Sequence, residues 1–292
     1  MENARHPVAR RTDDFLQGVD GKGMPWWECF ICRTVTRGNS LGTAWEQPYG
    51  GMMKGADEQP ELELDIHRVE IADELPEHRI LRLMTNRGQI FGRYYGRPDC
   101  EAGVIWVGGT GGGFDSPAGG LYDQVPPRLL EKGVSSLRIR FREPGNLDEC
   151  VLDVMAGMRV LESEGVSALG LVGYSFGGAV IIQAASTTPL VRSLVTLATQ
   201  SYATDTIDRF PPGGAILTIH GKQDEALPWQ GSQDLYDRAY RQERTLLLYE
   251  EGSHTLDEVA GDIERQVTHW LLRTLPHREN TGHHHPANHP PP

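Results

Sequence analysis

The short motif around Ser175 has the residue types that a nucleophilic serine requires. Residues 173–177 are Gly-Tyr-Ser-Phe-Gly, directly after the apolar residues 169–172 and before the small-residue stretch 177–180. This order predicts a strand, a sharp turn and a helix, with the serine at the turn. Glycines on both sides avoid the collisions that flanking side chains would make. Because so short a motif also occurs by chance, the prediction depends on the flanking strand and helix.

A serine hydroxyl becomes a good nucleophile only when a base removes its proton and an acid orients that base. In enzymes with this serine motif the three residues follow one another as Ser, Asp or Glu, and His. His254 follows the apolar residues 245–249, and Asp224 follows residues 216–220, so both come just after predicted strands. Ser175, Asp224 and His254 are therefore the predicted catalytic residues.

Other side chains compete for the roles of base and acid. Among the 11 histidines, His220 is the main competitor, but its place at a strand end favours a role in holding the turn. His269 falls within a predicted helix, where a surface or packing role is expected. For the acid, the alternatives are Glu225, Glu250 and Glu251. Asp224 is preferred because it follows its strand at the expected turn.

A negatively charged reaction intermediate would need two backbone N–H donors near the serine. One is predicted to come from Phe176, the residue after the nucleophile. The other should come from the Gly-rich loop that follows the predicted strand at residues 103–107. Thr110 is the predicted donor in that loop, with Gly109 or Gly111 as alternatives one residue away. Glycines there would let the backbone come close to a substrate.

A phosphate-binding loop is the competing interpretation of residues 108–113, which are Gly-Gly-Thr-Gly-Gly-Gly. The spacing matches a dinucleotide-binding fingerprint poorly, and no Lys-Ser or Lys-Thr pair follows as in a P-loop. Glu143 lies near the end of the next predicted strand, where a dinucleotide site needs an acid, so this alternative stays open.

Strand-like and helix-like segments alternate along most of the chain. Such alternation predicts an α/β fold with a mostly parallel sheet that helices cover on both faces. Reactive residues then gather at the carboxyl ends of the strands. No lid domain is expected, because only residues 199–215 join two of the late strands. Strands are expected at residues 67–71, 80–85, 89–95, 103–107, 135–141, 169–172, 194–198, 216–220 and 245–249, and helices at 121–132, 147–164, 177–186, 235–240 and 256–275.

Composition divides the chain into three parts. Residues 1–60 form an N-terminal extension that is expected to be partly disordered or packed on the core, with Met24–Thr36 as its apolar portion. Residues 61–276 form the expected α/β domain. Residues 277–292 form a His- and Pro-rich tail, for which disorder is expected because proline at this density prevents regular structure. Oligomeric state cannot be predicted from these features.

The four cysteines do not suggest a disulfide framework. Cys29 and Cys32 form a C-x-x-C pair, but a zinc site needs about four ligands and no second pair completes it. Ordinary thiols are therefore expected, with a metal or redox site as the alternative. No metal ion and no cofactor are expected.

The formal net charge of −12 argues against a nucleic-acid partner, which would favour a basic surface. No apolar run is long enough to span a bilayer. The first 23 residues lack the apolar stretch of a secretory signal. These features predict a cytoplasmic protein without a membrane span, whose partner is a small-molecule acyl substrate.

With these motifs in this order, the chain resembles the α/β-hydrolase superfamily, and more narrowly its dienelactone-hydrolase and acyl-peptidase-like serine hydrolases. Residues 220–228 (HGKQDEALP) and 250–254 (EEGSH) are similar to the family's segments around the acid and the base. The resemblance covers about residues 65–276 and implies a metal-free hydrolase with a Ser-Asp-His triad. Two features depart from the family. Dienelactone hydrolases proper have a cysteine nucleophile, and Gly108 stands where a histidine often begins the oxyanion loop.

The predicted activity is hydrolysis of a carboxylic ester through an acyl-enzyme intermediate, with thioesters and amides as further substrates. A carboxylesterase is favoured over a peptidase. An acyltransferase and a non-catalytic ligand-binding protein on the same scaffold remain alternatives. Tyr202 and Trp229 are the predicted substrate-binding residues, and Phe210 is a further candidate; each also fits a place at the rim of the site or in the core.

Overall fold

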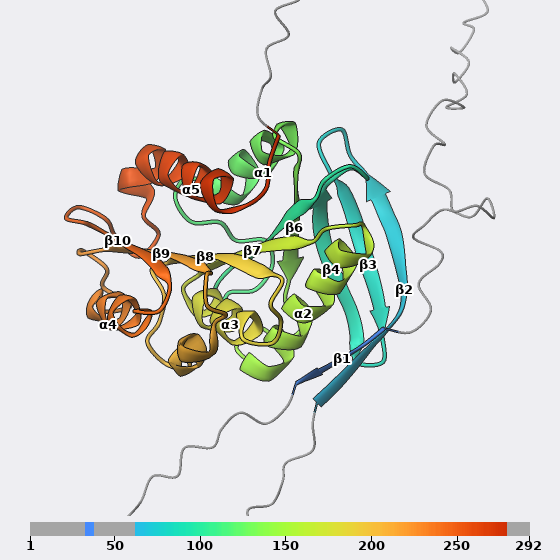
Figure 1. The fold of residues 1–292 in the computed structure, drawn as a ribbon, viewed down its shortest axis with the longest axis horizontal. Coiled ribbons are helices and arrows are strands. Elements are labelled where there is room, and N and C mark those ends of the chain that lie inside the picture. Colours follow the sequence, from blue (N-terminus) through green and yellow to red (C-terminus); the bar gives the residue numbers. More distant parts are fainter. Residues whose placement is uncertain (1–32, 38–61, 279–292) are drawn as a thin grey trace, which may run out of the picture.

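A single sheet organises the part of the chain that the computed structural model describes, residues 33–37 and 62–278. Its strand order is β1-β2-β3-β4-β6-β5-β7-β8-β9-β10 (Figure 1). The pairs from β1 to β6 are antiparallel, and those from β6 to β10 are parallel. The strands are β1 (Arg33–Arg37), β2 (Leu62–Glu74), β3 (Arg79–Thr85), β4 (Gly88–Tyr95), β5 (Ala102–Val107), β6 (Val134–Arg140), β7 (Ala168–Tyr174), β8 (Val191–Leu197), β9 (Ala215–Gly221) and β10 (Glu243–Tyr249).

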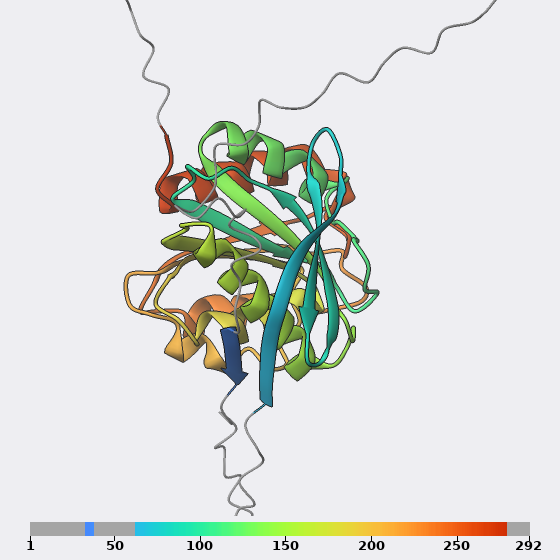
Figure 2. The same cartoon turned by 90° about the vertical axis from the view of Figure 1, so that its right-hand side faces the viewer.

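Helices cover both faces of the sheet (Figures 1 and 2). One face carries α1 and α5, and the other carries α2, α3 and α4. Each face has its own cluster of buried apolar side chains. The predicted α/β fold with a mostly parallel, doubly covered sheet is thus confirmed. The helices are α1 (Leu121–Glu131), α2 (Leu147–Ser163), α3 (Phe176–Ala185), α4 (Gln230–Arg238) and α5 (Ala260–Thr274), with the short 3₁₀ helices η2 (Asp205–Arg209) and η3 (Asp257–Val259).

The central strands β5 and β7 are buried along their whole length. Covering helices on both faces explain why these strands are continuous apolar runs rather than alternating ones. The chain leaves β5 towards β6 on one side and later returns to β7 on the other. The carboxyl ends of β5 and β7 therefore flank a point where the strand order reverses, the position at which sheets of this kind bind ligands.

Three features of the fold differ from the sequence-based expectation. Arg33–Arg37, within the predicted N-terminal extension, forms β1 and pairs with β2. Strand β2 begins at Leu62, several residues before the expected start. Helix α4 begins at Gln230 rather than at residue 235, and it ends at Arg238. The polar residues that open α4 carry no helical periodicity, and tertiary contacts hold them, with Gly231 and Ser232 buried.

The connection from β8 to β9 holds only the short helix η2, so no lid domain is inserted there, as predicted. Among the described residues, no helix is long and apolar enough to cross a membrane.

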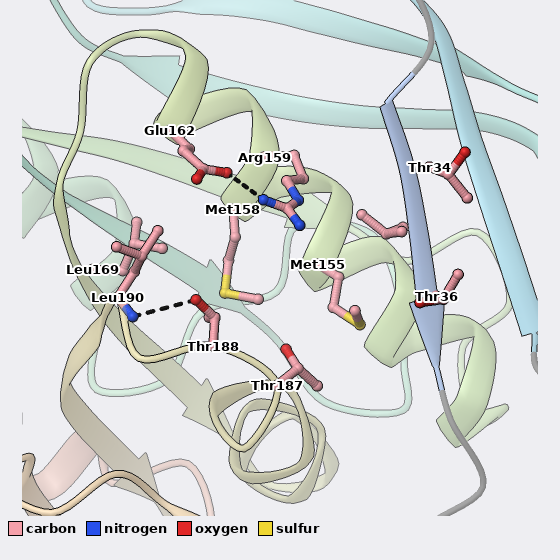
Figure 3. Close-up of a pocket in the computed structure, with 11 residues that line it drawn as sticks. Thr34, Thr36, Met155, Met158, Arg159, Glu162, Leu169, Thr187, Thr188 and Leu190 are labelled. Carbon is pink, nitrogen blue, oxygen red and sulfur yellow. Dashed lines mark hydrogen bonds and ion pairs between the residues drawn. The ribbon is translucent and has the colours of Figure 1, made fainter.

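A cavity of ≈ 160 Å³ lies between β1, α2 and the turn after α3 (Figure 3). Met155 and Met158 line it from α2, and Thr34 and Thr36 flank it from β1. Leu169, at the start of β7, also lines it. The cavity is therefore at the amino ends of the parallel strands, away from the carboxyl ends that carry Ser175 and its neighbours.

Candidate active site

Ser175 occupies a strained turn between β7 and α3. Its backbone angles are φ 55° and ψ −119°, which a residue other than glycine rarely adopts. The neighbouring backbone comes so close that side chains are excluded on both sides. A Cβ on Gly173 would lie 2.3 Å from the Gly177 carbonyl oxygen, and one on Gly177 would lie 2.3 Å from the Gly108 carbonyl oxygen. The glycines of the motif are thus required by the turn itself.

Ser175, His254 and Asp224 form a continuous chain of polar contacts. His254 Nε2 lies 3.2 Å from Ser175 Oγ, and His254 Nδ1 lies 2.7 Å from Asp224 Oδ2. Because a carboxylate only accepts, Nδ1 carries the ring proton and Nε2 presents a lone pair to the serine hydroxyl. The structure therefore brings together the three residues that the sequence analysis selected.

The loops that carry Asp224 and His254 are joined to each other by backbone hydrogen bonds. The Gln223 N–H donates to the Gly252 carbonyl (2.9 Å), and the Lys222 N–H donates to the Tyr249 carbonyl (2.7 Å). Parallel pairing of β9 with β10 places the two loops side by side at the same edge of the sheet. A short distance between Asp224 and His254 follows directly from this arrangement.

The Asp224 side chain is fully buried, and hydrogen bonds stabilise its negative charge. Its Oδ1 accepts the N–H groups of Ala226 and Leu227, each at 2.8 Å. Burial by itself would raise the pKa of this carboxyl, but the hydrogen bond from His254 and those from the two backbone groups lower it below its usual value. Asp224 is therefore ionised at neutral pH and can hold one tautomer of His254.

His220 is a second histidine bound to the same carboxylate. Its Nε2 lies 3.0 Å from Asp224 Oδ2 and 3.2 Å from the Leu227 carbonyl oxygen, and its Nδ1 lies 2.7 Å from Ser232 Oγ. Two acceptors at Nε2 place the proton there, so Nδ1 accepts from the Ser232 hydroxyl. Burial lowers the pKa of His220, and Asp224 opposes this only partly. The ring is neutral and holds the acid loop, as its sequence position suggested.

Tyr174 packs its ring against that of His254, with centroids 5.2 Å apart. Burial, followed by the negative charges of Asp115, Asp224 and Asp257, raises the pKa of Tyr174 to about 12. The phenol is neutral at physiological pH, and its ring limits the orientations open to the His254 imidazole. Tyr174 was not among the predicted site residues, although its place next to Ser175 in the chain could have indicated a role.

The Gly-rich loop after β5 lies close to Ser175. A Cβ built on Gly109 would lie 3.5 Å from Ser175 Cβ. Phe176 is the first residue of α3, so its N–H has no acceptor within the helix. The Gly109 N–H donates to Asp115 Oδ2 (2.9 Å), whereas no such partner occupies the Thr110 N–H within the described part of the chain.

Unlike His220, the other four competing side chains form no hydrogen bond with Ser175, Asp224 or His254 among the described residues. Glu250 pairs with Lys222. Glu225 and Glu251 are exposed, and so is His269 on α5. None of these four side chains contacts Ser175 or His254 in the described part of the molecule.

The predicted substrate-binding residues have different surroundings. Tyr202, in the loop after β8, is 78% exposed. Trp229 is partly buried in the loop after β9, and Lys222 Nζ lies 5.7 Å from its ring centroid. Phe210 is buried in the apolar cluster beneath α3 and belongs to the core. Tyr202 and Trp229 remain at the edge of the sheet that carries Ser175.

Some predictions concern residues outside the described ranges: the Cys29/Cys32 pair and the tail from residue 279 onward. Within residues 33–37 and 62–278, no three His, Cys, Asp or Glu side chains are grouped so as to hold a metal ion.

No protein-family model matches the chain. A relative from Escherichia coli O157:H7, named "Uncharacterized protein YfhR", is 36% identical over 63 residues. The match covers 20% of this chain and 22% of that protein, so the chain matches about a fifth of the relative's length.

Solved structures resemble this fold over most of their length. Dienelactone hydrolase from Anabaena variabilis ATCC 29413 has a TM-score of 0.60 at 16% identity, covering 70% of this chain and 100% of that one. Est1E from Butyrivibrio proteoclasticus has a TM-score of 0.58 at 14% identity, with coverages of 67% and 98%. XC6422 from Xanthomonas campestris, described as an α/β serine hydrolase without lid, has 0.54 at 23%, with coverages of 70% and 97%. This chain therefore has the α/β-hydrolase fold without an inserted lid, as the sequence resemblance predicted.

Proposed function

We propose that this protein is a serine hydrolase that cleaves carboxylic esters through an acyl-enzyme intermediate. The chain of contacts from Asp224 through His254 to Ser175 carries this proposal. Such an arrangement activates a serine for attack on an acyl carbon. The strained turn at Ser175, at the carboxyl end of β7, gives further support.

In the proposed first half-reaction, Ser175 Oγ forms a bond to the acyl carbon while His254 Nε2 takes the hydroxyl proton. The carbonyl electron pair moves onto oxygen, and the N–H groups of Phe176 and Thr110 bind the resulting oxyanion. When the carbonyl re-forms, the bond to the leaving alcohol breaks and His254 returns the proton to it. Asp224 keeps Nδ1 protonated and stabilises the imidazolium.

Water completes the proposed cycle. His254 takes a proton from a water molecule, the hydroxide adds to the acyl carbon, and the second tetrahedral intermediate collapses with return of the proton to Ser175. The His254 side chain is 25% exposed, so solvent reaches the base directly. This access favours hydrolysis over transfer of the acyl group to another alcohol.

Substrate contacts are proposed for Tyr202 and Trp229. Both are in loops that follow parallel strands, at the same edge of the sheet as Ser175. An exposed phenol and a half-buried indole can bind the acyl or alcohol portion of a small ester through their apolar faces.

Replacing Ser175 by alanine tests the proposal. The wild type is expected to hydrolyse 4-nitrophenyl esters of short or medium acyl chains, and S175A is expected to lose at least about 10⁴-fold in kcat because no acyl-enzyme forms. Initial rates over acetate, butyrate and octanoate esters measure this. S167A, which removes an exposed serine hydroxyl just before β7, is the control. Equal rates in the wild type and S175A would overturn the proposal.

A further inference from the structure

Asp115 closes the Gly-rich loop back onto its own beginning. Its Oδ2 accepts the N–H of Gly109 at 2.9 Å, across six residues of chain. Its Oδ1 is buried without a hydrogen-bond partner and is packed against Gly108. A carboxylate at this place is unexpected, since it lies beside the position where the proposed reaction develops negative charge.

Gly108 has no room for any side chain because Asp115 fills that space. A Cβ on Gly108 would lie 1.9 Å from Asp115 Oδ1. The carbonyl of Gly108 is directed at the other wall, where it approaches Gly177 so closely that a Cβ there would lie 2.3 Å from it. The peptide of Gly108 is thus held between the turn of the nucleophile and the carboxylate of Asp115.

These contacts determine which N–H of the loop remains for a substrate. Gly109 donates to Asp115, so its N–H cannot bind an oxyanion at the same time. The next N–H along the chain belongs to Thr110, and a Cβ built on Gly109 would lie 3.5 Å from Ser175 Cβ. Among the described residues, no backbone acceptor takes up the Thr110 N–H.

We propose that Asp115 is a positioning residue of the oxyanion hole: by holding the Gly109 N–H and filling the space beside Gly108, it presents the Thr110 N–H to the reacting carbonyl. This inference rests on the proposed serine-hydrolase function. It also accounts for Gly108, the residue that stands where the resembled family often has histidine, because that side chain and Asp115 would need the same space.

The loop is anchored at further points that do not involve Asp115. The Ala118 N–H donates to the Thr255 carbonyl (2.8 Å), and the Gly119 N–H donates to Asp257 Oδ1 (2.7 Å). Arg138 also binds the Phe114 carbonyl. Loss of the Asp115 carboxylate is therefore expected to loosen residues 108–113 without detaching the rest of the loop, so the variants should fold.

An effect on the oxyanion appears in kcat rather than in KM, because the donor is used most strongly in the transition state. Removing an oxyanion donor outright costs about 10²- to 10³-fold in kcat. A donor that is still present but less well oriented should cost less, about 10- to 100-fold. Asparagine retains a side-chain oxygen that can accept the Gly109 N–H, and it removes the negative charge.

The test compares D115A and D115N with the wild type, using 4-nitrophenyl butyrate and an alkyl trifluoromethyl ketone, which forms a tetrahedral oxyanion adduct with an active serine. D115A is expected to lower kcat about 10- to 100-fold and to raise the inhibition constant of the ketone by a similar factor, with KM changed less than about threefold. D115N is expected to recover kcat to within about threefold of the wild type. D99A, which breaks an exposed ion pair with Arg278 before β5, should change none of these values.

A second comparison uses Gly108. G108A is expected to lower kcat as D115A does, since its Cβ would displace Asp115 Oδ1. The double variant G108A/D115A should be no slower than the slower single variant, because both changes remove the same restraint.

The outcomes distinguish failure of the positioning role of Asp115 from failure of the proposed serine-hydrolase function. An active wild type with unchanged kcat and ketone affinity in D115A overturns the role of Asp115 and leaves the serine-hydrolase function standing. Equal losses in D115A and D115N also overturn it, because the accepting oxygen would then be irrelevant. A wild type without turnover of any ester in the panel overturns the proposed function, and with it the positioning role.

Discussion

His254→Ala is expected to lower kcat for ester hydrolysis by about five orders of magnitude, with KM changed only a few-fold. His254 Nε2 is 3.2 Å from Ser175 Oγ, and no other ring nitrogen in the described part of the chain contacts that hydroxyl. Without this base, the serine proton has no acceptor and the leaving alcohol has no donor. Stopped-time assays with 4-nitrophenyl butyrate at high enzyme concentration measure the residual rate.

The control for this loss is His269→Ala, which removes an exposed imidazole on α5 and should leave kcat unchanged. The double variant S175A/H254A supplies a further test. Residues that act as one unit show strongly non-additive losses, so the double variant should be about as slow as either single variant. Losses that multiply would show that the two residues act in separate steps and would contradict their proposed partnership.

Asp224→Asn is expected to lower kcat by about four orders of magnitude while the fold remains intact. Asp224 Oδ1 accepts two backbone N–H groups, so the carbonyl oxygen of the introduced amide would take that place. Its NH₂ group would then face His254 Nδ1 and His220 Nε2, both of which donate to Oδ2 in the wild type. An NH₂ donor facing His254 Nδ1 favours the other tautomer of His254. In that tautomer Nε2 carries the proton and cannot accept one from the serine.

Glu225→Gln is the matched control, because it changes the next carboxylate, which is exposed and outside the triad. Its kcat should equal that of the wild type. Circular dichroism and the unfolding temperature of Asp224→Asn monitor the fold. An Asp224→Asn variant that retained more than about a tenth of the wild-type kcat would exclude Asp224 as the acid of the triad.

The spatial cluster of Ser175, Asp224 and His254 could be predicted from the sequence because each of these residues is tied to a local pattern. Ser175 is in a motif that requires a tight turn, and Asp224 and His254 each follow an apolar run. Parallel strands end at the same edge of a sheet, so three residues that each follow a strand meet there. The strand alternation that made this argument possible also gave the fold class correctly.

Features that depend on distant partners were harder to predict. Arg33–Arg37 is a strand only because it pairs with β2 across residues 38–61, and no motif in it indicates that pairing. Helix α4 opens with polar residues, and Ser232 is held there by a hydrogen bond to His220. The periodicity of apolar residues indicates neither the β1–β2 pairing nor the hydrogen bond between Ser232 and His220.

The loop that ends at Asp115 contains a contact within the site that was also not predictable from the sequence. Its glycines predicted a close approach to the substrate, and Thr110 was selected as the donor by its place in the chain. The contact between Asp115 and Gly109 arises only when the loop folds back, so it has no counterpart in residue spacing. The sequence signal for this contact is the acidic residue Asp115 close to the Gly-rich loop, where a negative charge would oppose a developing oxyanion.

The most direct test of the central claim is to locate the covalent adduct that a fluorophosphonate forms with the protein. The account predicts one adduct per chain in the intact mass, mapped by peptide sequencing to Ser175 in the segment Gly-Tyr-Ser-Phe-Gly, and no adduct in S175A. An unmodified wild type, or an adduct on another residue that persists in S175A, would contradict the claim that Ser175 is an activated nucleophile.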